Sequence, residues 1–478
     1  MAKEKQQLKK SLNPLSVWAI AFGCIIGWGS FINPGKKFLP NSGVAGTAIA
    51  MVLGALVMMI IAVSYAYMVP KHPKAGGEFT FTKSNFGKIP AFICGWFLVA
   101  AYLTNVPMNS TAIPLIMEGL FGETAVSWGV GSYAVAGSTV YLGGIVVAVL
   151  FLVGFAVLNI LGVEKAGFIQ KALAITLATC AFTLCISGIV FAIKDGVNFN
   201  PLWGFDKSAL AGGEGVKANS WAPAILATFA IAPWAFVGFD TIPQAAEEFK
   251  FPFKKVIKIM IIAIAFGAFV YISNNTICAV ALNNWPELCV EGKWVVLVAA
   301  EKMLGTFGKV LVGFGVASAV LSGMMGFYLA SSRLMWSMAK DGFLPRTFAK
   351  LDEKHQTPRN ALIFCLIISL VGPFLGREAL GWFVDMSSIG ASIGFFFTCL
   401  CAAHEMKKDK DGNMFKFVCA IIGCTFSVVF MILQLIPIPG FESVHFVWQS
   451  YVMLGVWVLL GVIFFLWQRK KIGVPVEL

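Results

Sequence analysis

The stretch Gly23-Cys24-Ile25-Ile26-Gly27-Trp28-Gly29-Ser30-Phe31 lies in the middle of the first long apolar segment, at about residues 15–39. A helix that crosses lipid is expected to stay regular, because hydrocarbon offers no partner to a freed backbone group. Three glycines, followed by Asn33-Pro34, instead predict a helix that stops and restarts at a cavity. The restarted half would begin with free N–H groups at a positive dipole end, which suits a carboxylate. Close helix packing through the G-x-x-x-G spacing is the alternative.

The composition is that of an integral membrane protein. Of 478 residues, 58% are hydrophobic and 13% are charged, and the mean hydropathy is +0.81. A soluble chain carries about 25% charged residues. The eleven cysteines are an odd number and lie mostly in apolar segments, and the four histidines fall in loops or at span ends. These patterns predict no disulfide framework, no metal site, no cofactor and no enzyme active site.

Apolar runs of about 20 residues, the length needed to cross a bilayer, divide the chain into twelve expected spans. We therefore predict an all-α membrane protein with twelve transmembrane helices, in a single transmembrane domain over residues 1–478. The expected spans lie at about residues 15–39, 43–69, 87–119, 136–159, 166–193, 221–247, 256–281, 306–339, 359–376, 379–403, 415–437 and 446–468.

The distribution of Lys and Arg predicts the orientation. With the N-terminus inside, 26 of the 36 Lys and Arg residues fall on the cytoplasmic side and nine fall outside. This is the bias of the positive-inside rule. It predicts a multi-pass protein of the cell (cytoplasmic) membrane with both termini in the cytoplasm. The net charge of +12 then reflects orientation, and we expect the lipid bilayer, not nucleic acid, as the partner.

The sixth expected span carries a second interruption, in Ala232-Pro233-Trp234-Ala235-Phe236-Val237-Gly238-Phe239-Asp240. The proline removes a helical hydrogen bond, the glycine relaxes the backbone, and Asp240 places a carboxyl within the span. Interrupted helices five spans apart predict inverted repeats, at about residues 15–193 and 221–403, with a binding site where the repeats meet. Two extra helices would follow at about residues 415–468. A simple proline kink is the alternative.

The chain also carries four blocks, in this order: Gly23 to Phe31 with Pro34; Pro70-Lys71-His72-Pro73-Lys74-Ala75-Gly76-Gly77-Glu78-Phe79; Phe236-Val237-Gly238-Phe239-Asp240 with Ala246-Glu247-Glu248-Phe249-Lys250-Phe251-Pro252; and Ser332-Arg333-Leu334-Met335-Trp336-Ser337-Met338-Ala339-Lys340-Asp341-Gly342-Phe343-Leu344-Pro345. By these blocks the chain resembles the amino acid–polyamine–organocation (APC) superfamily of permeases over nearly its whole length. The resemblance implies the five-plus-five inverted-repeat (LeuT-like) fold, with discontinuous helices 1 and 6.

The resemblance also implies how an amino acid would bind. Its carboxylate would meet backbone N–H groups of the first break, from Trp28 to Ser30, and its ammonium group would meet carbonyls of both breaks. Partial charges at the half-helix ends would supply affinity for any α-amino acid, so that selectivity is left to the pocket walls. The implied substrate-binding residues are Ile25, Gly27, Trp28, Gly29, Ser30, Asn105, Trp234 and Val237.

Three of these side chains have alternative roles. Trp28 departs from the small residue usual at its position, and it would narrow the cavity if its ring faced inward, with a lipid-facing ring as the alternative. Trp234 resembles an aromatic gate of some relatives, with packing or lipid contact as the alternative. Asn105 resembles a polar selector position in the arginine/agmatine antiporters, with a hydrogen bond between packed helices as the alternative.

Asp240 and Arg333 are expected to act in coupling or gating. A carboxyl within the membrane is costly, so Asp240 is predicted to take up a proton or to attract a cationic substrate. Simple pairing with a lysine or a backbone amide is the alternative. Arg333 and Asp341 are expected to lie on the inner rim, as an inside gate or a structural clamp.

The coupling ion stays open. Some relatives carry a lysine in the fifth span where sodium-coupled cousins bind sodium, but no lysine lies near the matching residue Leu177. Ser318 and Ser322 are weak candidates for sodium ligands, since serines in membrane helices also serve packing. Coupling to H+, coupling to Na+ and uncoupled exchange all remain possible from the sequence.

The sequence thus predicts a secondary active transporter of amino acids or related amines, working by alternating access. Proton-coupled symport is the mode we expect, and an amino acid/amine exchanger is the alternative. A nutrient receptor that binds but does not transport is the alternative from a different class.

Overall fold

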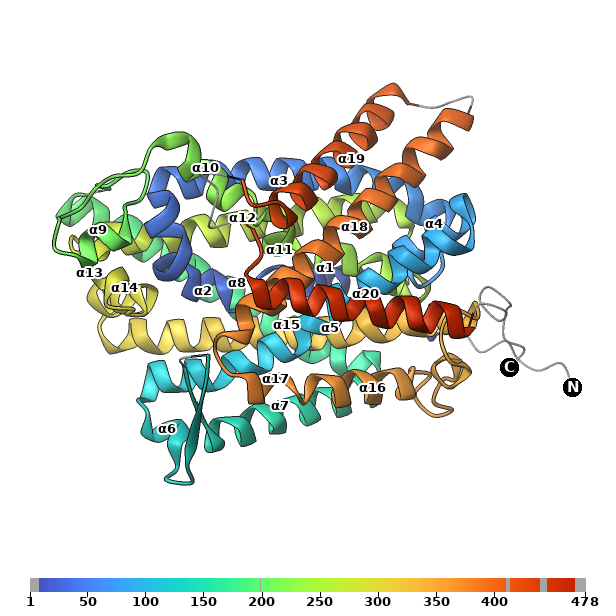
Figure 1. Ribbon diagram of the computed structural model, residues 1–478, viewed down its shortest axis with the longest axis horizontal. Coiled ribbons are helices and arrows are strands. Elements are labelled where there is room, and N and C mark those ends of the chain that lie inside the picture. Colours follow the sequence, from blue (N-terminus) through green and yellow to red (C-terminus); the bar gives the residue numbers. More distant parts are fainter. Residues whose placement is uncertain (1–7, 137, 198, 410–412, 439–444, 469–478) are drawn as a thin grey trace, which may run out of the picture.

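The protein, described by a computed structural model, is built almost entirely of helices that run along its long axis (Figure 1). The structure describes residues 8–136, 138–197, 199–409, 413–438 and 445–468. This architecture is that of an all-α membrane protein. Within the described part, strands β1 (Ser132–Val135) and β2 (Ser138–Tyr141) pair as one antiparallel hairpin. The fourth span, expected from residue 136, therefore begins only at Leu142.

The helices of the first half follow the expected spans, except that the first apolar segment is divided. Asn13 caps the first helix, because its Oδ1 accepts a hydrogen bond from the N–H of Ser16 at 2.9 Å. The first apolar segment is then split between two helices and a π-helical turn at Pro34–Phe38. The helices are α1 (Pro14–Ile25), α2 (Gly29–Asn33), α3 (Leu39–Lys71), α4 (Gly77–Phe86), α5 (Lys88–Phe121), α6 (Thr124–Ser127), α7 (Leu142–Ile160), α8 (Val163–Asp195) and α9 (Lys207–Ala211).

The second half contains longer helices after an irregular beginning. Short helices and 3-10 turns occupy the sixth expected span, with the turns at Phe239–Thr241 and Pro243–Glu248. The helices are α10 (Trp221–Phe229), α11 (Ala232–Phe236), α12 (Val256–Ala281), α13 (Trp285–Val290), α14 (Val295–Leu304), α15 (Thr306–Lys340), α16 (Arg359–Ser369), α17 (Gly372–Leu375), α18 (Ala379–Lys408), α19 (Met414–Leu435) and α20 (Trp448–Gln468).

Among the described residues, nine helical stretches are long and apolar enough to cross a membrane, and Pro14–Ile25 and Arg359–Leu375 are shorter apolar helices. The sixth expected span is missing from both groups because its helix is interrupted. The protein is thus a multi-pass membrane protein, whereas the count of twelve spans stays a prediction. The long stretches are Gly29–Lys71, Lys88–Phe121, Leu142–Ile160, Ala166–Asp195, Phe253–Ala281, Thr306–Lys340, Ala379–Lys408, Met414–Leu435 and Trp448–Trp467.

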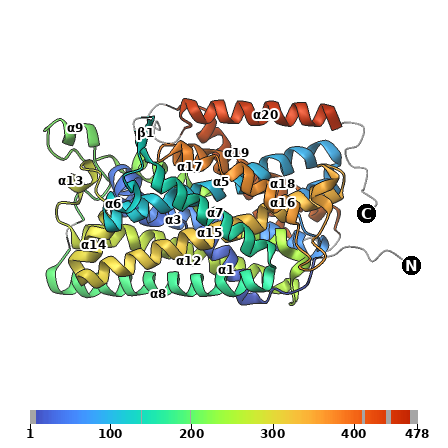
Figure 2. The ribbon, with the colours of Figure 1, turned by 90° about the horizontal axis from the view of Figure 1, so that it is seen from below.

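The long helices α5, α15 and α18 form the centre of the bundle. Helix α5 packs against both α15 and α18, and α1 packs against α8, α12 and α15. Helix α20 lies along one side of the molecule, and α8 lies along the other (Figure 2). The short interrupted helices are thereby surrounded by regular ones, so that freed backbone groups are kept away from lipid.

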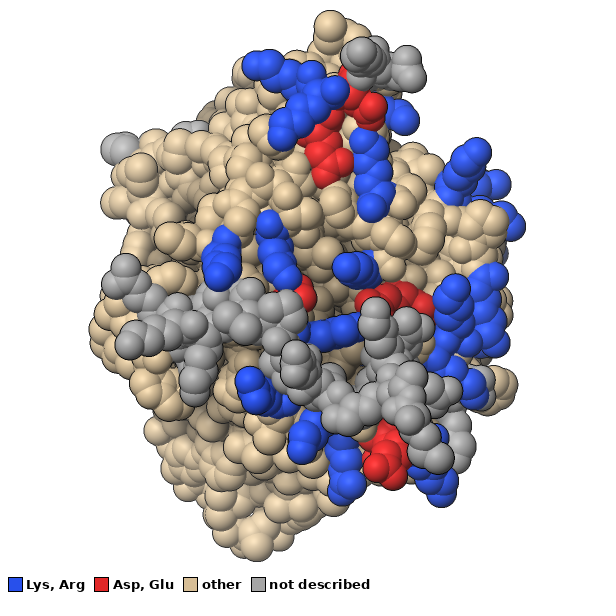
Figure 3. Space-filling view, turned by 90° about the vertical axis from the view of Figure 1, so that its right-hand side faces the viewer, with Lys and Arg blue, Asp and Glu red and all other residues tan. Residues whose placement is uncertain are grey.

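The two ends of the molecule differ in charge. Figure 3 shows Lys and Arg gathered over the end where α3, α15 and α18 finish. Ion pairs link elements here, among them Lys71 with Asp409 at 2.8 Å and Lys83 with Asp341 at 2.8 Å. We call this the basic end; its exposed residues include Lys71, Lys74, Lys88, Lys254, Arg346 and Lys407. The hairpin, α9 and α13 lie at the opposite end (Figure 1).

Candidate functional site

The first helix stops at Ile25 and restarts at Gly29, as the sequence predicts. The N–H groups of Gly27, Trp28 and Gly29 donate to no acceptor among the described residues, whereas the N–H of Ser30 donates to Gly27 O at 3.2 Å. Three amides at the start of a half-helix are therefore free to bind an anion. The prediction named Trp28, Gly29 and Ser30; the structure moves this set by one residue, because Ser30 is already bonded.

The sixth expected span is interrupted twice, at Ala230 and Ile231 just before Pro233, and again at Val237 and Gly238. Pro233 sits in the first turn of α11, where its missing N–H costs no helical bond. Helix α11 ends because Val237 is extended, with ψ of 124°, and Gly238 takes a φ of 142°, which disfavours any residue with a side chain. The interruption before α11 is where a proline effect is expected, and the glycine break at Gly238 adds to it.

The two breaks touch each other. A Cβ atom at Gly238 would lie 2.6 Å from the N of Ile25 and 2.7 Å from the Cβ of Cys24. A Cβ at Gly29 would lie 2.3 Å from Cη2 of Trp234. Neither position has room for a side chain, so glycine at both allows the half-helices to meet.

A small inner cavity lies where the breaks meet. Its volume is about 10 Å³, enough for roughly one water molecule, so the site is closed in this conformation. It brings together five of the predicted site residues and adds five that the sequence did not suggest. It is lined by Cys24, Ile25, Gly27, Trp28, Asn105, Met108, Asn109, Trp234, Tyr271 and Phe327. None of these side chains carries a charge.

Unpartnered polar atoms face this cavity. Asn109 Oδ1 and Trp28 Nε1 are buried and have no hydrogen-bond partner among the described residues. A Cβ at Gly27 would meet only Asn109 Oδ1, at 3.8 Å, so the glycine opens on the same space. Buried polar atoms are rarely left unpaired without a function. The spacing of Asn109, one helical turn after Asn105, is the signal that could have found it.

Asn105 and Ser30 are already engaged. Asn105 Nδ2 donates to Ala101 O at 2.7 Å and to Ser387 Oγ at 2.7 Å. The helix-packing alternative for Asn105 is therefore realised, although the residue also lines the cavity. Ser30 Oγ donates to Gly27 O at 3.0 Å and thereby steadies the restarted helix.

An outer vestibule lies on the other side of the tryptophans. It consists of two cavities, of about 480 and about 170 Å³, that share Trp28, Lys36, Arg377 and Leu380. The rings of Trp28 and Trp234 lie 6.4 Å apart, and both residues line the smaller outer cavity as well as the inner one. The two rings therefore separate the vestibule from the inner cavity.

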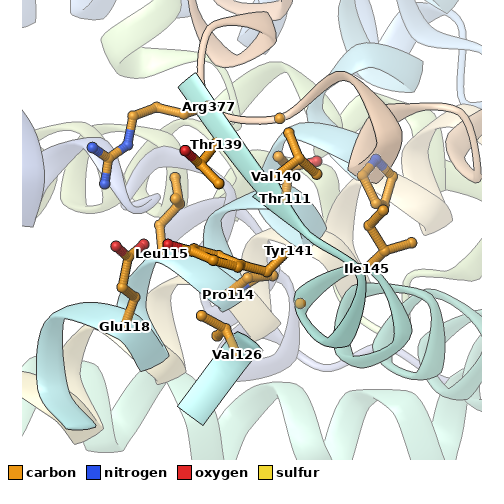
Figure 4. Close-up of a pocket in the computed structure, with 13 residues that line it drawn as sticks. Thr111, Pro114, Leu115, Glu118, Val126, Thr139, Val140, Tyr141, Ile145 and Arg377 are labelled. Atoms are coloured by element: carbon orange, nitrogen blue, oxygen red, sulfur yellow. The ribbon is translucent and has the colours of Figure 1, made fainter. Parts of the chain in front are cut away.

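Figure 4 shows a third, smaller pocket of about 40 Å³ beneath strand β2. In it the Tyr141 ring lies between Leu115 and the strand. Glu118 and Arg377 lie together on one side of the pocket. Leu115, Glu118 and Arg377 also line the larger vestibule cavity, so this pocket is its side branch.

Asp240 is fully buried but does not line the inner cavity. Its carboxylate accepts hydrogen bonds from the N–H of Gly238 at 2.7 Å and from the hydroxyl of Tyr102 at 2.9 Å. Of its two predicted roles, direct attraction of a cationic substrate has no support in this geometry.

Arg333 pairs with Glu248, not with Asp341. Arg333 Nε donates to Glu248 Oε1 at 2.8 Å, and both side chains are almost fully buried. Asp341 pairs with Lys83 instead. Nearby, the N–H of Ala75 donates to Glu247 at 3.3 Å, and Ser337 Oγ donates to Ala75 O at 2.7 Å. These contacts join the segment between α3 and α4 and helix α15 with the turn at Pro243–Glu248 at the basic end.

The serines proposed for sodium lie between α1 and α15. Ser322 Oγ lies 3.5 Å from Gly23 O and 3.1 Å from Ala319 O, and Ser318 is buried nearby on the same helix. Gln170 of α8 reaches the same place and donates to Ala19 O at 3.0 Å. In the described part of the chain, no three His, Cys, Asp or Glu residues form a group that could hold a metal ion.

Comparison with known proteins shows the family. The profile of a family described as "Amino acid permease" matches residues 12–463. The chain is 24% identical to the branched-chain amino acid permease of Bacillus subtilis, over 98% of this chain and 94% of the relative. It is 24% identical to the methylthioribose transporter (98% and 95%) and 28% identical to the serine/threonine exchanger (78% of each) of the same species.

Proposed function

The chain belongs to the amino acid permease family, and from this premise we propose that it moves a neutral α-amino acid across the cell membrane by alternating access. One observation carries the proposal. Gly27 and Trp28, whose amide N–H groups are free, and Asn109, whose carbonyl oxygen has no partner, line one closed cavity between two broken helices. This set complements a zwitterion, which has one group that accepts hydrogen bonds and one that donates them.

The carboxylate would bind the free N–H groups of Gly27, Trp28 and Gly29, at the positive end of α2. The ammonium group would donate to Asn109 Oδ1 and to the Ile25 carbonyl, at the end of α1. That carbonyl already receives the Tyr271 hydroxyl at 3.3 Å, and a carbonyl oxygen can accept a second bond.

The residues that line this cavity suit a substrate with a neutral side chain best. Apart from Asn105 and Asn109, the side chains that line it are apolar or aromatic, and a charged substrate would have no counter-ion there. Branched-chain and serine or threonine side chains, which the names of two relatives specify, are uncharged. Cationic amines, which the sequence left open, are disfavoured for the same reason.

We infer that this conformation faces outward. The outer vestibule is open, while the substrate site between the two breaks is closed. The vestibule reaches Trp28 and Trp234 from one end, while buried contacts shut the basic end. The positive-inside rule would put the basic end in the cytoplasm, with both termini there. We propose the twelve-helix, five-plus-five repeat topology, in which the two broken helices rock against α5, α15 and α18.

Proton-coupled symport is the mode we propose, through Asp240. Exchange of one substrate for another is the second mode that this site could serve, since one relative is named as an exchanger. Sodium binding near Ser318 and Ser322 remains a third, and a receptor that binds without transport would use the same inner cavity.

Counterflow in proteoliposomes tests the transport claim without any ion gradient. Vesicles preloaded with leucine or serine are expected to accumulate the labelled amino acid, and vesicles preloaded with arginine or putrescine are not. Accumulation driven only by the cationic preloads would overturn the neutral substrate class. Binding without any counterflow would support a receptor and contradict transport.

Replacing Asn109 with leucine should weaken substrate binding. The side chain would lose its hydrogen bond to the ammonium group, and a bond to a charged group contributes about 1.5–3 kcal/mol. We expect KM to rise roughly 10- to 100-fold. Asn159→Leu is the matched control, since Asn159 is also buried and also donates to the carbonyl four residues earlier, but lies on α7 outside the cavity. Equal KM values in the two variants would refute the role of Asn109.

A further inference from the structure

A second polar cluster lies beside the inner cavity and is not part of it. Glu78, at the start of α4, and Asp240 are both fully buried. The Glu78 carboxylate accepts hydrogen bonds from the hydroxyl of Tyr65 at 2.7 Å and from Nε2 of Gln244 at 2.6 Å. The same Nε2 lies 3.3 Å from the hydroxyl of Tyr102, which donates to Asp240. One continuous network therefore joins the two carboxyls.

No cation balances these carboxyls. Among the described residues, neither has a Lys, Arg or His nitrogen within 4.0 Å. The nearby cations are engaged elsewhere, Arg333 of α15 with Glu248 and Lys83 of α4 with Asp341. Two buried negative charges without a cation are costly, so the pair favours holding a proton. The titratable groups that face the pair are Cys24 of α1, Tyr65 of α3, and Cys94 and Tyr102 of α5, while α18 presents Gly394 and Thr398.

The contacts of Tyr102 suit either protonation state of Asp240. The tyrosine hydroxyl has one hydrogen, but Asp240 Oδ2 and Asp240 O lie 2.9 and 3.1 Å away. When Asp240 is ionised, the hydroxyl donates to Oδ2. When Oδ2 carries a proton, the carboxyl donates to the hydroxyl, whose own hydrogen turns to the carbonyl. Asp240 is hydrogen-bonded in both states.

Gln244 can likewise form a hydrogen bond with Glu78 in either protonation state of its carboxyl. In the described orientation its Nε2 donates to the Glu78 carboxylate, and its Oε1 is buried without a partner. The amide nitrogen and oxygen exchange places when the group rotates by half a turn. Turned in this way, Oε1 would accept a hydrogen bond from a protonated Glu78. The unpartnered oxygen is thus explained as the acceptor for the second protonation state.

We propose that Glu78 and Asp240 together form the binding site for one transported proton, a role that rests on the transport function proposed above. A proton from the outer solution forms an O–H bond with one carboxylate, and the same bond breaks when the proton leaves toward the cytoplasm; no electrons are transferred. Asp240 lies two residues from Gly238, and the backbone of Gly238 packs closely against Cys24 and Ile25 at the first break. Protonation is therefore linked through the backbone to the substrate site.

Two assays on proteoliposomes test the proposal, namely counterflow without a gradient and uptake driven by an inward proton gradient. Glu78→Gln and Asp240→Asn should keep counterflow within about 2-fold of the wild type and lose at least 10-fold of gradient-driven uptake. Glu78→Asp should restore part of that uptake. Glu301→Gln, at an exposed carboxyl of α14, should behave as the wild type in both assays. Full gradient-driven uptake by Glu78→Gln would overturn the proposal.

The wild type separates this proposal from the proposed function. If it shows counterflow but no response to a proton gradient, the proton site is refuted and transport stands. If it shows no counterflow with any amino acid, the transport function itself fails. If the carboxyl variants do not fold, Tyr102→Phe tests the network instead, because it keeps both carboxyls and removes only the bridging hydroxyl. It should shift the pH midpoint of driven uptake by about one unit, and an unchanged midpoint would contradict the network.

Discussion

Gly29→Val is expected to abolish substrate binding and transport while leaving the protein folded. Even the first atom of the new side chain would lie 2.3 Å from the Trp234 ring, a separation that atoms in van der Waals contact do not reach. The ring would have to move, and it lines both the outer vestibule and the inner cavity, which has room for roughly one water molecule. We expect a loss of at least 100-fold in substrate affinity, measured by equilibrium binding of the labelled amino acid.

The control for this variant is Gly154→Val, in the middle of α7. A Cβ there would meet nothing within 4 Å, so the same change of residue should leave binding intact. Size-exclusion chromatography of both variants shows whether each is folded. Normal transport by Gly29→Val would refute the idea that the contact between the two breaks shapes the site.

Arg333→Ala should produce the largest loss of stability. Arg333 is fully buried, and its removal would leave the Glu248 carboxylate without its cation. Breaking a buried ion pair from one side costs about 3–5 kcal/mol. The half-exposed pair of Lys83 and Asp341 is the control, because loss of such a pair costs about 1 kcal/mol or less. Thermal unfolding of Arg333→Ala and Lys83→Ala measures the difference.

A double variant distinguishes a gate from a clamp. Arg333→Met combined with Glu248→Leu removes both charges, which is often neutral for stability. If the pair is a gate, the double variant should fold as stably as the wild type but transport at least 10-fold more slowly. Transport at the wild-type rate would mean that the pair only clamps the basic end.

The first break could be predicted because its cause is local. Glycines and a proline within an apolar run change the backbone wherever they stand. The second break could be predicted for the same reason, from Pro233 and Gly238. The helix is interrupted on both sides of α11, before Pro233 and at Gly238, and the spacing alone did not show that there are two interruptions.

The partners of buried polar groups could not be predicted, because they join distant parts of the chain. Arg333 and Glu248 are 85 residues apart, and Gln244 and Glu78 are 166 apart. Spacing along one helix suggested Asp341 for Arg333, whereas packing of α15 against the turn at Pro243–Glu248 decides the actual pair. Asn109 lies one helical turn after Asn105, which is a signal in the sequence, but its oxygen without a partner is revealed only by the packed structure.

The decisive measurement is a structure of the protein with a bound neutral amino acid. We predict the substrate carboxylate within about 3.2 Å of the N–H groups of Gly27, Trp28 and Gly29, with the ammonium group at Asn109 Oδ1. The inner cavity would have to be expanded around it, with the Trp28 and Trp234 rings moved apart or closed over the substrate. An amino acid bound only in the outer vestibule, at Lys36 and Arg377, with the two breaks unoccupied, would contradict the account.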